Sequence, residues 1–318
     1  MNLNLINNNE YTKFIINNNT LTKCAKDMIL NLHKLKNTVY IDSKDKFQMY
    51  YYYQKAVESK DRTLVDLLLH FTNIKTIELI EKKLKSKSKK VSDVDIITII
   101  GKSGGSIQKD EICSKWDFVF QNLANKCFEL FGKDKFNYLD ISCGNCKKTV
   151  KFGQYLNLDY KSIYGCDIPH WGPYGEGKKK PVQFDLIKDG KLPYKDNFFK
   201  MVSIMFSLHH IESLKDFIKE MRRIVMPGGY LILIEHDMFN DYDKILIDIE
   251  HKIYGVLYDD RPDYCDKPDF MTTYNRYEWD FLLSKVGFKN VFSDVLYFDV
   301  DRHIRYDKPF YSIYCLGN

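Results

Sequence analysis

The sequence predicts an α/β fold in which a mainly parallel sheet carries the functional residues. An apolar run at 136–141 leads into a loop of small residues at 142–146 and then into a segment that can open a helix. A second apolar run, 162–166, ends directly before Asp167. The run 201–206 is apolar apart from one serine, which is typical of a central parallel strand covered on both faces. This succession of strand, tight turn and helix predicts a nucleotide-type pocket.

The loop 142–146 is suited to hold a ligand against the backbone. Its small residues, among them Ser142, Cys143 and Gly144, allow close approach, and the following helix directs N–H groups toward the ligand. Asp140, at the end of the preceding strand, would repel a pyrophosphate. It suits a ligand that carries a cationic amine and a sulfonium, such as S-adenosylmethionine.

A second acid strengthens this interpretation. Asp167 lies 27 residues after Asp140, at the end of the second predicted strand. In dinucleotide-type folds an acid at this place accepts hydrogen bonds from both ribose hydroxyls. The alternative is an aspartate that only shapes the turn after the strand.

The chain resembles class I (Rossmann-like) S-adenosylmethionine-dependent methyltransferases of the type-11-like group. Their first motif reads acid-x-Gly-x-Gly-x-Gly, and this chain reads Asp-Ile-Ser-Cys-Gly-Asn-Cys at 140–146, with the central glycine kept. Serine and cysteine are small, but they adopt positive φ less readily than glycine. Ser-Leu-His-His-Ile at 207–211 matches the family's x-L-H-H-[LI]. The stretch 220–235, with Pro-Gly-Gly followed by an apolar run and Glu, resembles R-V-L-K-P-G-G-x-L-x-I-x-E/D.

The resemblance implies a Rossmann-like seven-stranded methyltransferase sheet with helices on both faces, whose last strand, 309–316, is antiparallel. We place this domain at 108–318 and a basic, mainly helical appendage at 1–107. We expect the Asn-rich residues 1–20 to be weakly ordered. Strand five is expected at 230–234.

Local signals also predict where two helices begin. Ser213 with Asp216 has the spacing of a capping box, which predicts a helix start there. Asn275 to Glu278 is expected to open a later helix.

The resemblance also assigns cofactor contacts. Asp140 would hold the methionine amine, Asp167 the ribose and Asp185 the adenine amine. Ser207 and His209 would flank the methionine end. The implied cofactor-binding residues are Asp140, Ser142, Cys143, Gly144, Asp167, Ile168, Asp185, Leu186, Phe206, Ser207 and His209.

Four residues are candidates for deprotonating or orienting the methyl acceptor: His209, His210, His236 and Asp237. They follow predicted strands four and five, and ligands of open α/β sheets bind at the carboxyl ends of the strands. Imidazole and carboxylate groups can take a proton there. Alternatively, these histidines are packed and hydrogen-bonded structural groups. Methyl transfer is an in-line displacement, so positioning alone can dominate the rate.

The methyl acceptor is left open by the sequence. The net charge is +5, and a lysine-rich run occupies 81–90, which favours RNA or another polyanion as a partner of the N-terminal part. The alternative is a solvated helix end or linker. We expect RNA, as a cap or a base, to be the acceptor, with protein and small-molecule acceptors also open. A catalytically inactive scaffold that binds RNA or a partner enzyme is the alternative function.

The apolar runs and the cysteines indicate in which cellular compartment the protein is expected. We find no secretory signal and no apolar run near the ~18 residues that span a bilayer, so we expect a cytoplasmic protein without membrane contact. The eight cysteines are then expected to be free thiols. Cys143 and Cys146 form a C-x-x-C motif. The two cysteines are interpreted either as small residues of the loop or as a redox or zinc-binding pair. No second C-x-x-C completes a zinc site, and we expect no metal.

Overall fold

The computed structural model describes residues 6–19, 21–23, 25–27, 29–30, 109–168, 182–239, 247, 271–272, 274–296 and 309–317, with side chains omitted at 109–115. The lysine-rich run 81–90 lies outside these residues, as does most of the predicted appendage. The chain divides into two compact units, and the first comprises Met1–Leu30, Ile112–Asp237 and Met271–Asn318. The elements below belong to this first unit, apart from the first residues of helix α7. The domain boundary at 107/108 stays a prediction.

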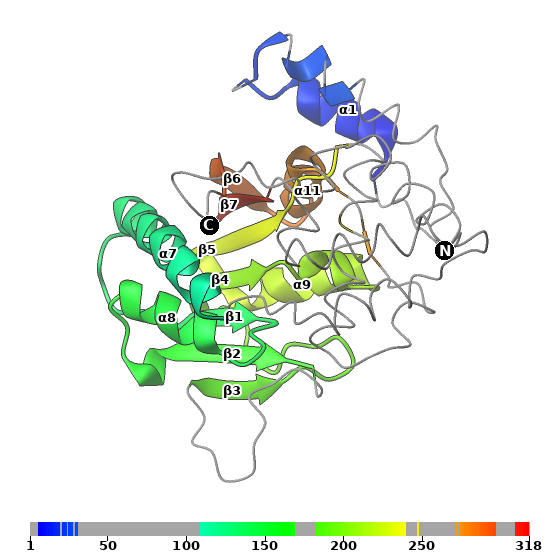
Figure 1. Ribbon diagram of the computed structural model, residues 1–318. Helices are drawn as coiled ribbons and strands as arrows, with labels where there is room; N and C mark the ends of the chain where they lie inside the picture. Colours follow the sequence, from blue (N-terminus) through cyan, green and yellow to red (C-terminus); the bar gives the residue numbers. More distant parts are fainter. Residues whose placement is uncertain are drawn as a thin grey trace, which may run out of the picture. The chain divides into compact units, whose positions relative to one another are not determined.

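The first unit is built on a seven-stranded sheet of order β3-β2-β1-β4-β5-β7-β6 (Figure 1). Strands β1 to β5 pair in parallel, whereas β7 is antiparallel to both β5 and β6. This arrangement confirms the predicted fold class and its antiparallel last strand. The strands are β1 (Tyr138–Ile141), β2 (Ile163–Asp167), β3 (Gln183–Leu186), β4 (Phe199–Met205), β5 (Val225–His236), β6 (Phe288–Val295) and β7 (Pro309–Leu316).

The strand order reverses between β1 and β4. β1 pairs with β2 on one side and with β4 on the other, and its residues are buried throughout. The chain winds outward from β1 in one direction and from β4 in the other. Ligands of open α/β sheets bind outside the carboxyl ends of the strands at such a reversal.

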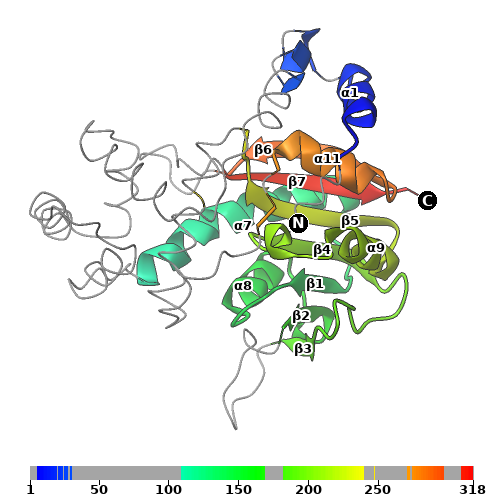
Figure 2. The same ribbon diagram turned by 90° about the vertical axis from the view of Figure 1, so that its right-hand side faces the viewer.

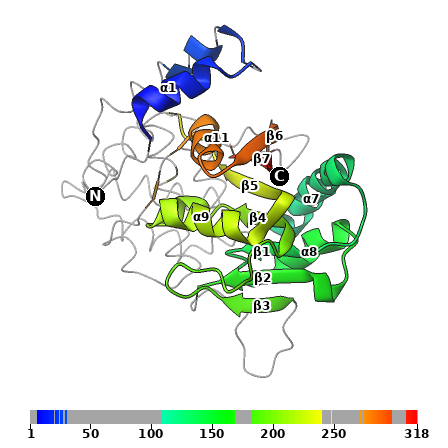
Figure 3. The same ribbon diagram turned by 180° about the vertical axis from the view of Figure 1, so that it is seen from behind.

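Helices cover both faces of the sheet (Figures 2 and 3). α7 (Lys109–Phe131) and α8 (Lys147–Tyr155) pack on one face, whereas α9 (Leu214–Ile224) and α11 (Arg276–Ser284) pack on the other. The buried side chains of α9 recur every three or four residues and so form one stripe. Two apolar clusters, one on each side of the sheet, therefore hold the strands in place. No helix among the described residues is long and apolar enough to cross a membrane.

The N-terminal segment contains a helix, α1 (Asn8–Ile16), so the expected weakly ordered start is wrong here. The Asn7 side chain caps it by accepting from two backbone N–H groups, and Tyr11 and Ile15 are buried. Tyr11 packs edge-on against Phe281 of α11, with ring centroids 5.6 Å apart. The sequence signal was an asparagine N-cap followed by apolar residues four apart, which the Asn-rich composition concealed.

Two local expectations are also corrected by the structure. Strand β5 begins at Val225 rather than at Tyr230, because the Pro-Gly-Gly segment is a register shift inside the strand and not a break before it. Ser213 is the N-cap of α9 but makes no capping hydrogen bond through its side chain. The Asp216 carboxylate instead accepts from Lys219, one turn further on. A capping box occurs instead at the start of α11, where the stretch Asn275–Glu278 was expected to open a helix.

Candidate active site

The loop after β1 keeps a backbone conformation that favours glycine. Ser142, Gly144 and Cys146 have φ angles of 56°, 54° and 60°. These are the three positions at which the resembled motif has glycine. A non-glycine residue in the left-handed region costs about 1–2 kcal/mol. The loop therefore retains its shape at an energetic cost, and such strain is concentrated at functional sites.

Residues with positive φ that are not glycine, asparagine or aspartate lie only near this site within the described part of the chain. Among the described residues, the other non-glycine positions with positive φ are Asn157, Asp189, Asn197 and Phe206. Asparagine and aspartate adopt this conformation readily in turns. The serine and cysteine of the loop and Phe206 do not, and all three follow the carboxyl ends of β1 and β4. The strained backbone thus marks the point where the strand order reverses.

Asp167 and Gly144 are brought into direct contact at this point. One Asp167 carboxylate oxygen accepts from the Gly144 N–H at 2.7 Å, and the other accepts from the Ile168 N–H at 2.7 Å. Burial raises the pKa of Asp167, and the two N–H groups oppose that rise. Among the described residues, no heavy atom lies within 4 Å of a Cβ placed on Gly144, so they leave space over the loop.

These groups fit the adenosine portion of the implied cofactor. The Asp167 carboxylate is fixed in place, and its remaining lone pairs can accept from ribose hydroxyls. Ile168 beside it is 45% exposed, an apolar side chain of the kind that covers a nucleoside. Asp185 is exposed and Leu186 is half-buried on β3, and Leu186 pairs with Asp167 in the sheet register. The adenine role of these two residues stays a prediction.

Asp140 is bonded within the protein. Its carboxylate accepts from Thr149 Oγ1 at 2.6 Å and from Ser203 Oγ at 2.7 Å, and Ser203 in turn contacts the Tyr138 hydroxyl at 2.8 Å. Burial raises the pKa of Asp140 to about 6, and the two hydroxyl donors oppose that rise. Asp140 therefore ties β1, β4 and α8 together at the strand reversal. Its predicted contact with the methionine amine stays a prediction.

Glu235, at the end of β5, organises the turn after β4. Its Oε1 accepts from the backbone N–H groups of Ser207 at 3.1 Å and Leu208 at 2.8 Å. Its Oε2 lies 2.6 Å from Nδ1 of His209, and both side chains are fully buried. Burial raises the pKa of Glu235, and the charges of His236 and His210 oppose that rise.

The three candidate histidines gather around this carboxylate. The His209 ring lies 4.1 Å from the His210 ring and 5.2 Å from the His236 ring, measured between centroids. Phe206 packs on His236 at 4.9 Å. His209 is 0% and His236 4% exposed, whereas His210 is half-buried. Within the described residues, no three His, Cys, Asp or Glu side chains are grouped to hold a metal ion.

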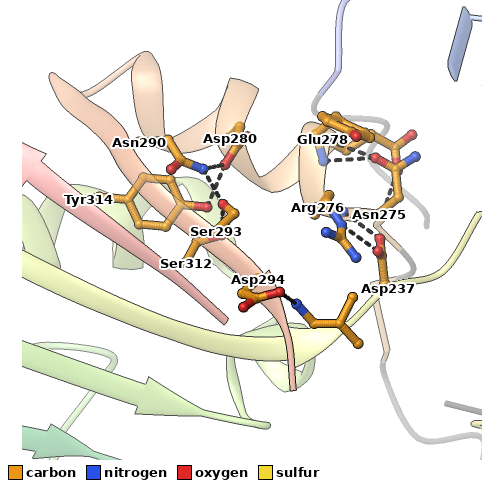
Figure 4. A network of polar contacts seen from close by, with 12 residues as sticks. Asp237, Asn275, Arg276, Glu278, Asp280, Asn290, Ser293, Asp294, Ser312 and Tyr314 are labelled. Carbon is orange, nitrogen blue, oxygen red and sulfur yellow. Dashed lines mark hydrogen bonds and ion pairs between the residues drawn. The ribbon is translucent and has the colours of Figure 1, made fainter. Parts of the chain in front are cut away.

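Asp237, the fourth candidate, is paired with α11. Its carboxylate accepts from the Arg276 backbone N–H at 2.8 Å and from Arg276 Nε at 2.6 Å (Figure 4). Asp237 therefore joins the end of β5 to the first turn of α11. Arg276, Thr149 and Ser203 were not singled out from the sequence. The isolated serine in an otherwise apolar strand was the one signal that pointed to any of them.

Cys143 and Cys146 place their sulfur atoms 3.4 Å apart, and both side chains are buried. The hydrogen bond with Cys146, followed by burial, raises the pKa of the Cys143 thiol. A thiolate is the form that reacts or binds zinc, and this environment disfavours it. The geometry therefore favours the interpretation of both cysteines as small packed loop residues.

The strand reversal, the left-handed loop after β1 and the acid at the end of β2 together define a class I S-adenosylmethionine-dependent methyltransferase domain. Comparison with known proteins points to the same class. Residues 139–233 match the model of the methyltransferase domain family. S-Adenosylmethionine is the cofactor of this class.

Curated relatives share the same part of the chain. A demethylmenaquinone methyltransferase of Bacillus mycoides is 35% identical over 104 residues, which cover 30% of this chain and 43% of that protein. The corresponding enzyme of Lysinibacillus sphaericus is 29% identical over 133 residues, covering 38% and 56%. A ubiquinone/menaquinone biosynthesis C-methyltransferase UbiE of Neisseria meningitidis is 33% identical over 96 residues, covering 30% and 38%. The chain thus spans about half the length of the curated relatives it matches.

Solved structures with similar folds include two methyltransferases. A Haloferax volcanii putative methyltransferase, in complex with the Trm112 activator, gives a TM-score of 0.43 at 12% identity and covers 67% of this chain and 100% of that chain. The 1,6-didemethyltoxoflavin-N1-methyltransferase of Burkholderia thailandensis was solved with bound S-adenosylhomocysteine. It gives a TM-score of 0.41 at 12% identity and covers 63% of this chain and 79% of that chain.

Proposed function

We propose that this chain is an enzyme that transfers a methyl group from S-adenosylmethionine to an acceptor at the carboxyl ends of β4 and β5. The observation that carries this proposal is the contact between Asp167 and the Gly144 N–H, beside open space over the loop. A ribose-binding carboxylate held in place by the loop has a clear use in a cofactor site. It also argues against a scaffold whose pocket is no longer used.

S-Adenosylmethionine supplies an electrophilic methyl group on its sulfonium. The contribution of the chain is to bind, align and exclude water. The 142–146 loop and Asp167 hold the nucleoside side, and the turn 207–210 lies at the carboxyl end of the neighbouring strand. Fixing donor and acceptor in line removes most of the entropic cost of the reaction.

On the acceptor side, His210 is the best candidate for a general base. It is half-buried, whereas the other three candidates are at most 4% exposed. An imidazole nitrogen can act as a general base, so His210 could take a proton from the acceptor. This role requires an acceptor that loses a proton on methylation.

We infer that the acceptor is a small molecule with a weakly acidic hydroxyl, such as a hydroquinone. Two features support this choice: the half-buried imidazole of His210, which can take a proton, and relatives that are named for quinone methylation. The shared region covers about half of those relatives, so the acceptor of this chain has to be tested directly. RNA is the second candidate, and the lysine-rich run 81–90 favours it.

The test is a methyl-transfer assay with isotope-labelled S-adenosylmethionine and the full chain. Label should enter a hydroquinone-type acceptor, and a His210→Gln variant should transfer it about 100-fold more slowly. Incorporation into RNA in place of the hydroquinones would move the assignment to the second candidate. No transfer to either class, from a protein that binds the cofactor, would overturn both acceptor proposals.

A further inference from the structure

We propose that Glu235 is a positioning residue for the acceptor side of this site: it fixes the turn after β4 and one tautomer of His209, and thereby sets the orientation of His210. The inference rests on the proposed function only for its kinetic consequence. The arrangement that carries it is a set of contacts among residues from β5 and from the turn 207–210.

The first step is that Glu235 accepts hydrogen bonds from the backbone of the turn 207–210. Oε1 accepts from the N–H groups of Ser207 at 3.1 Å, Leu208 at 2.8 Å and His209 at 3.4 Å. One oxygen on β5 thus receives three consecutive N–H groups that follow the end of β4. A shorter or neutral side chain would hold these donors less firmly, because hydrogen bonds to an ionised acceptor are the stronger ones.

The second step concerns the proton on His209. Oε2 of Glu235 lies 2.6 Å from Nδ1 of His209, and it also accepts from the His236 N–H at 3.3 Å. The three N–H groups at Oε1 favour the ionised form of Glu235, and a carboxylate in that form only accepts. We therefore assign the proton of this contact to Nδ1 of His209. The other ring nitrogen, Nε2, then holds the lone pair when the imidazole is neutral. Glu235 therefore selects one tautomer of a fully buried histidine.

The third step is that the fixed turn and the fixed His209 ring determine the position of His210. The backbone carbonyl of His209 accepts from the Thr272 N–H at 2.8 Å and from its hydroxyl at 3.3 Å, which holds the turn from a second side. The His209 ring lies 4.1 Å from the His210 ring. Since His209 is fully buried, it cannot reach an acceptor and must act through its neighbour. His210 is half-buried and is therefore the more exposed of the two rings.

The experiment compares the wild-type chain with Glu235→Gln. The substitution keeps the size of the side chain, but the new amide N–H would face Nδ1 of His209 and would favour the Nε2–H tautomer. Long-range ¹H–¹⁵N NMR of the imidazoles should show His209 as Nδ1–H in the wild type and as Nε2–H in the variant, with shifted His210 signals. The wild-type spectrum alone is decisive if the variant does not fold: an Nε2–H tautomer there overturns the proposal.

Steady-state kinetics distinguish a positioning role from a purely structural one, because loss of positioning should lower kcat and leave KM for the cofactor nearly unchanged. We expect Glu235→Gln to lower kcat about 10–100-fold with the acceptor that the wild type methylates, while KM for S-adenosylmethionine stays within about twofold. Glu235→Asp, which keeps the charge, should recover part of the loss. Asp280→Asn, at a half-buried carboxylate on α11, is the matched control and should leave kcat unchanged.

The two proposals fail in different ways. A wild type that binds the cofactor but methylates no acceptor contradicts the proposed function, and the NMR arm still decides the role of Glu235. Unchanged His210 signals in Glu235→Gln, or an equal loss of kcat in Asp280→Asn, overturn the positioning role even where methyl transfer is found.

Discussion

Replacing Gly144 by alanine is expected to separate cofactor binding from folding. Gly144 has φ 54°, and a Cβ built on it meets no heavy atom within 4 Å in the part of the chain that the structure describes. The added methyl group therefore has room in the protein itself. It would occupy the open space beside the N–H that holds Asp167, where the cofactor has to approach the backbone.

The expected loss of stability follows from the positive φ of Gly144, and the expected loss of affinity follows from the space that the added methyl group would fill. Alanine in the left-handed region costs about 1–2 kcal/mol, and its smaller unfolded-state entropy returns about 0.4–1 kcal/mol. The net loss of about 1 kcal/mol should lower Tm by about 2–4 °C. A methyl group in the ligand's path should weaken S-adenosylmethionine binding by at least about tenfold, or about 1.4 kcal/mol.

The assay pairs thermal unfolding with isothermal titration, and Gly132→Ala is the control. Gly132 also has positive φ, 78°, and also leaves room for a Cβ among the described residues. It lies in the connection between α7 and β1, before the amino end of β1, whereas Gly144 follows the carboxyl end of that strand. Both variants should lose similar stability, and only Gly144→Ala should lose affinity. Equal affinity in the two variants would refute the placement of the cofactor over the 142–146 loop.

Three further predictions concern the loop and the buried acids. Ser142→Gly should keep cofactor binding and change the free energy of unfolding by less than about 1 kcal/mol, whereas Ser142→Val should destabilise by about 2 kcal/mol, because a β-branched residue is poorly tolerated at positive φ. Urea unfolding checks both. Thr149→Val removes a donor from the buried Asp140 carboxylate and should cost about 1–3 kcal/mol by the same measurement. An unchanged midpoint would contradict that contact. Burial raises the pKa of Asp280 from 3.8 to about 6, so the folded state binds a proton more tightly and the contribution of Asp280 to stability falls as pH rises from about 4 to 6. Asp280→Asn should therefore gain stability relative to the wild type across this window, by about 3 kcal/mol at pH 7. A stability difference that does not depend on pH would refute this prediction.

The sequence specified the sheet well because its signals are local. The acids at 140 and 167 and the L-H-H turn each follow from a short stretch, and each lies where that stretch indicated. The first helix was missed because Asn7 was counted as part of a polar tract and not recognised as a cap. The start of β5 was misplaced because the proline and two glycines form a register shift inside the strand.

The site was less predictable because its partners are distant in sequence. Ser203 bonds Asp140 across 63 residues, and Glu235 bonds His209 across 26 residues. Neither contact leaves a local pattern, so the residues that hold the site could not be found together. The positive φ of Ser142 and Cys146 was equally hidden, because neither residue type requires that conformation.

The most direct test of the central claim is the binding of S-adenosylmethionine to the purified full chain by isothermal titration, with Asp167→Ala measured beside it. We predict one site with a Kd on the order of micromolar for the wild type, and a loss of about 100-fold or more in the variant, since two hydrogen bonds to a charged group disappear. Absence of binding to the wild type at millimolar cofactor, or equal affinity in Asp167→Ala, would contradict the account.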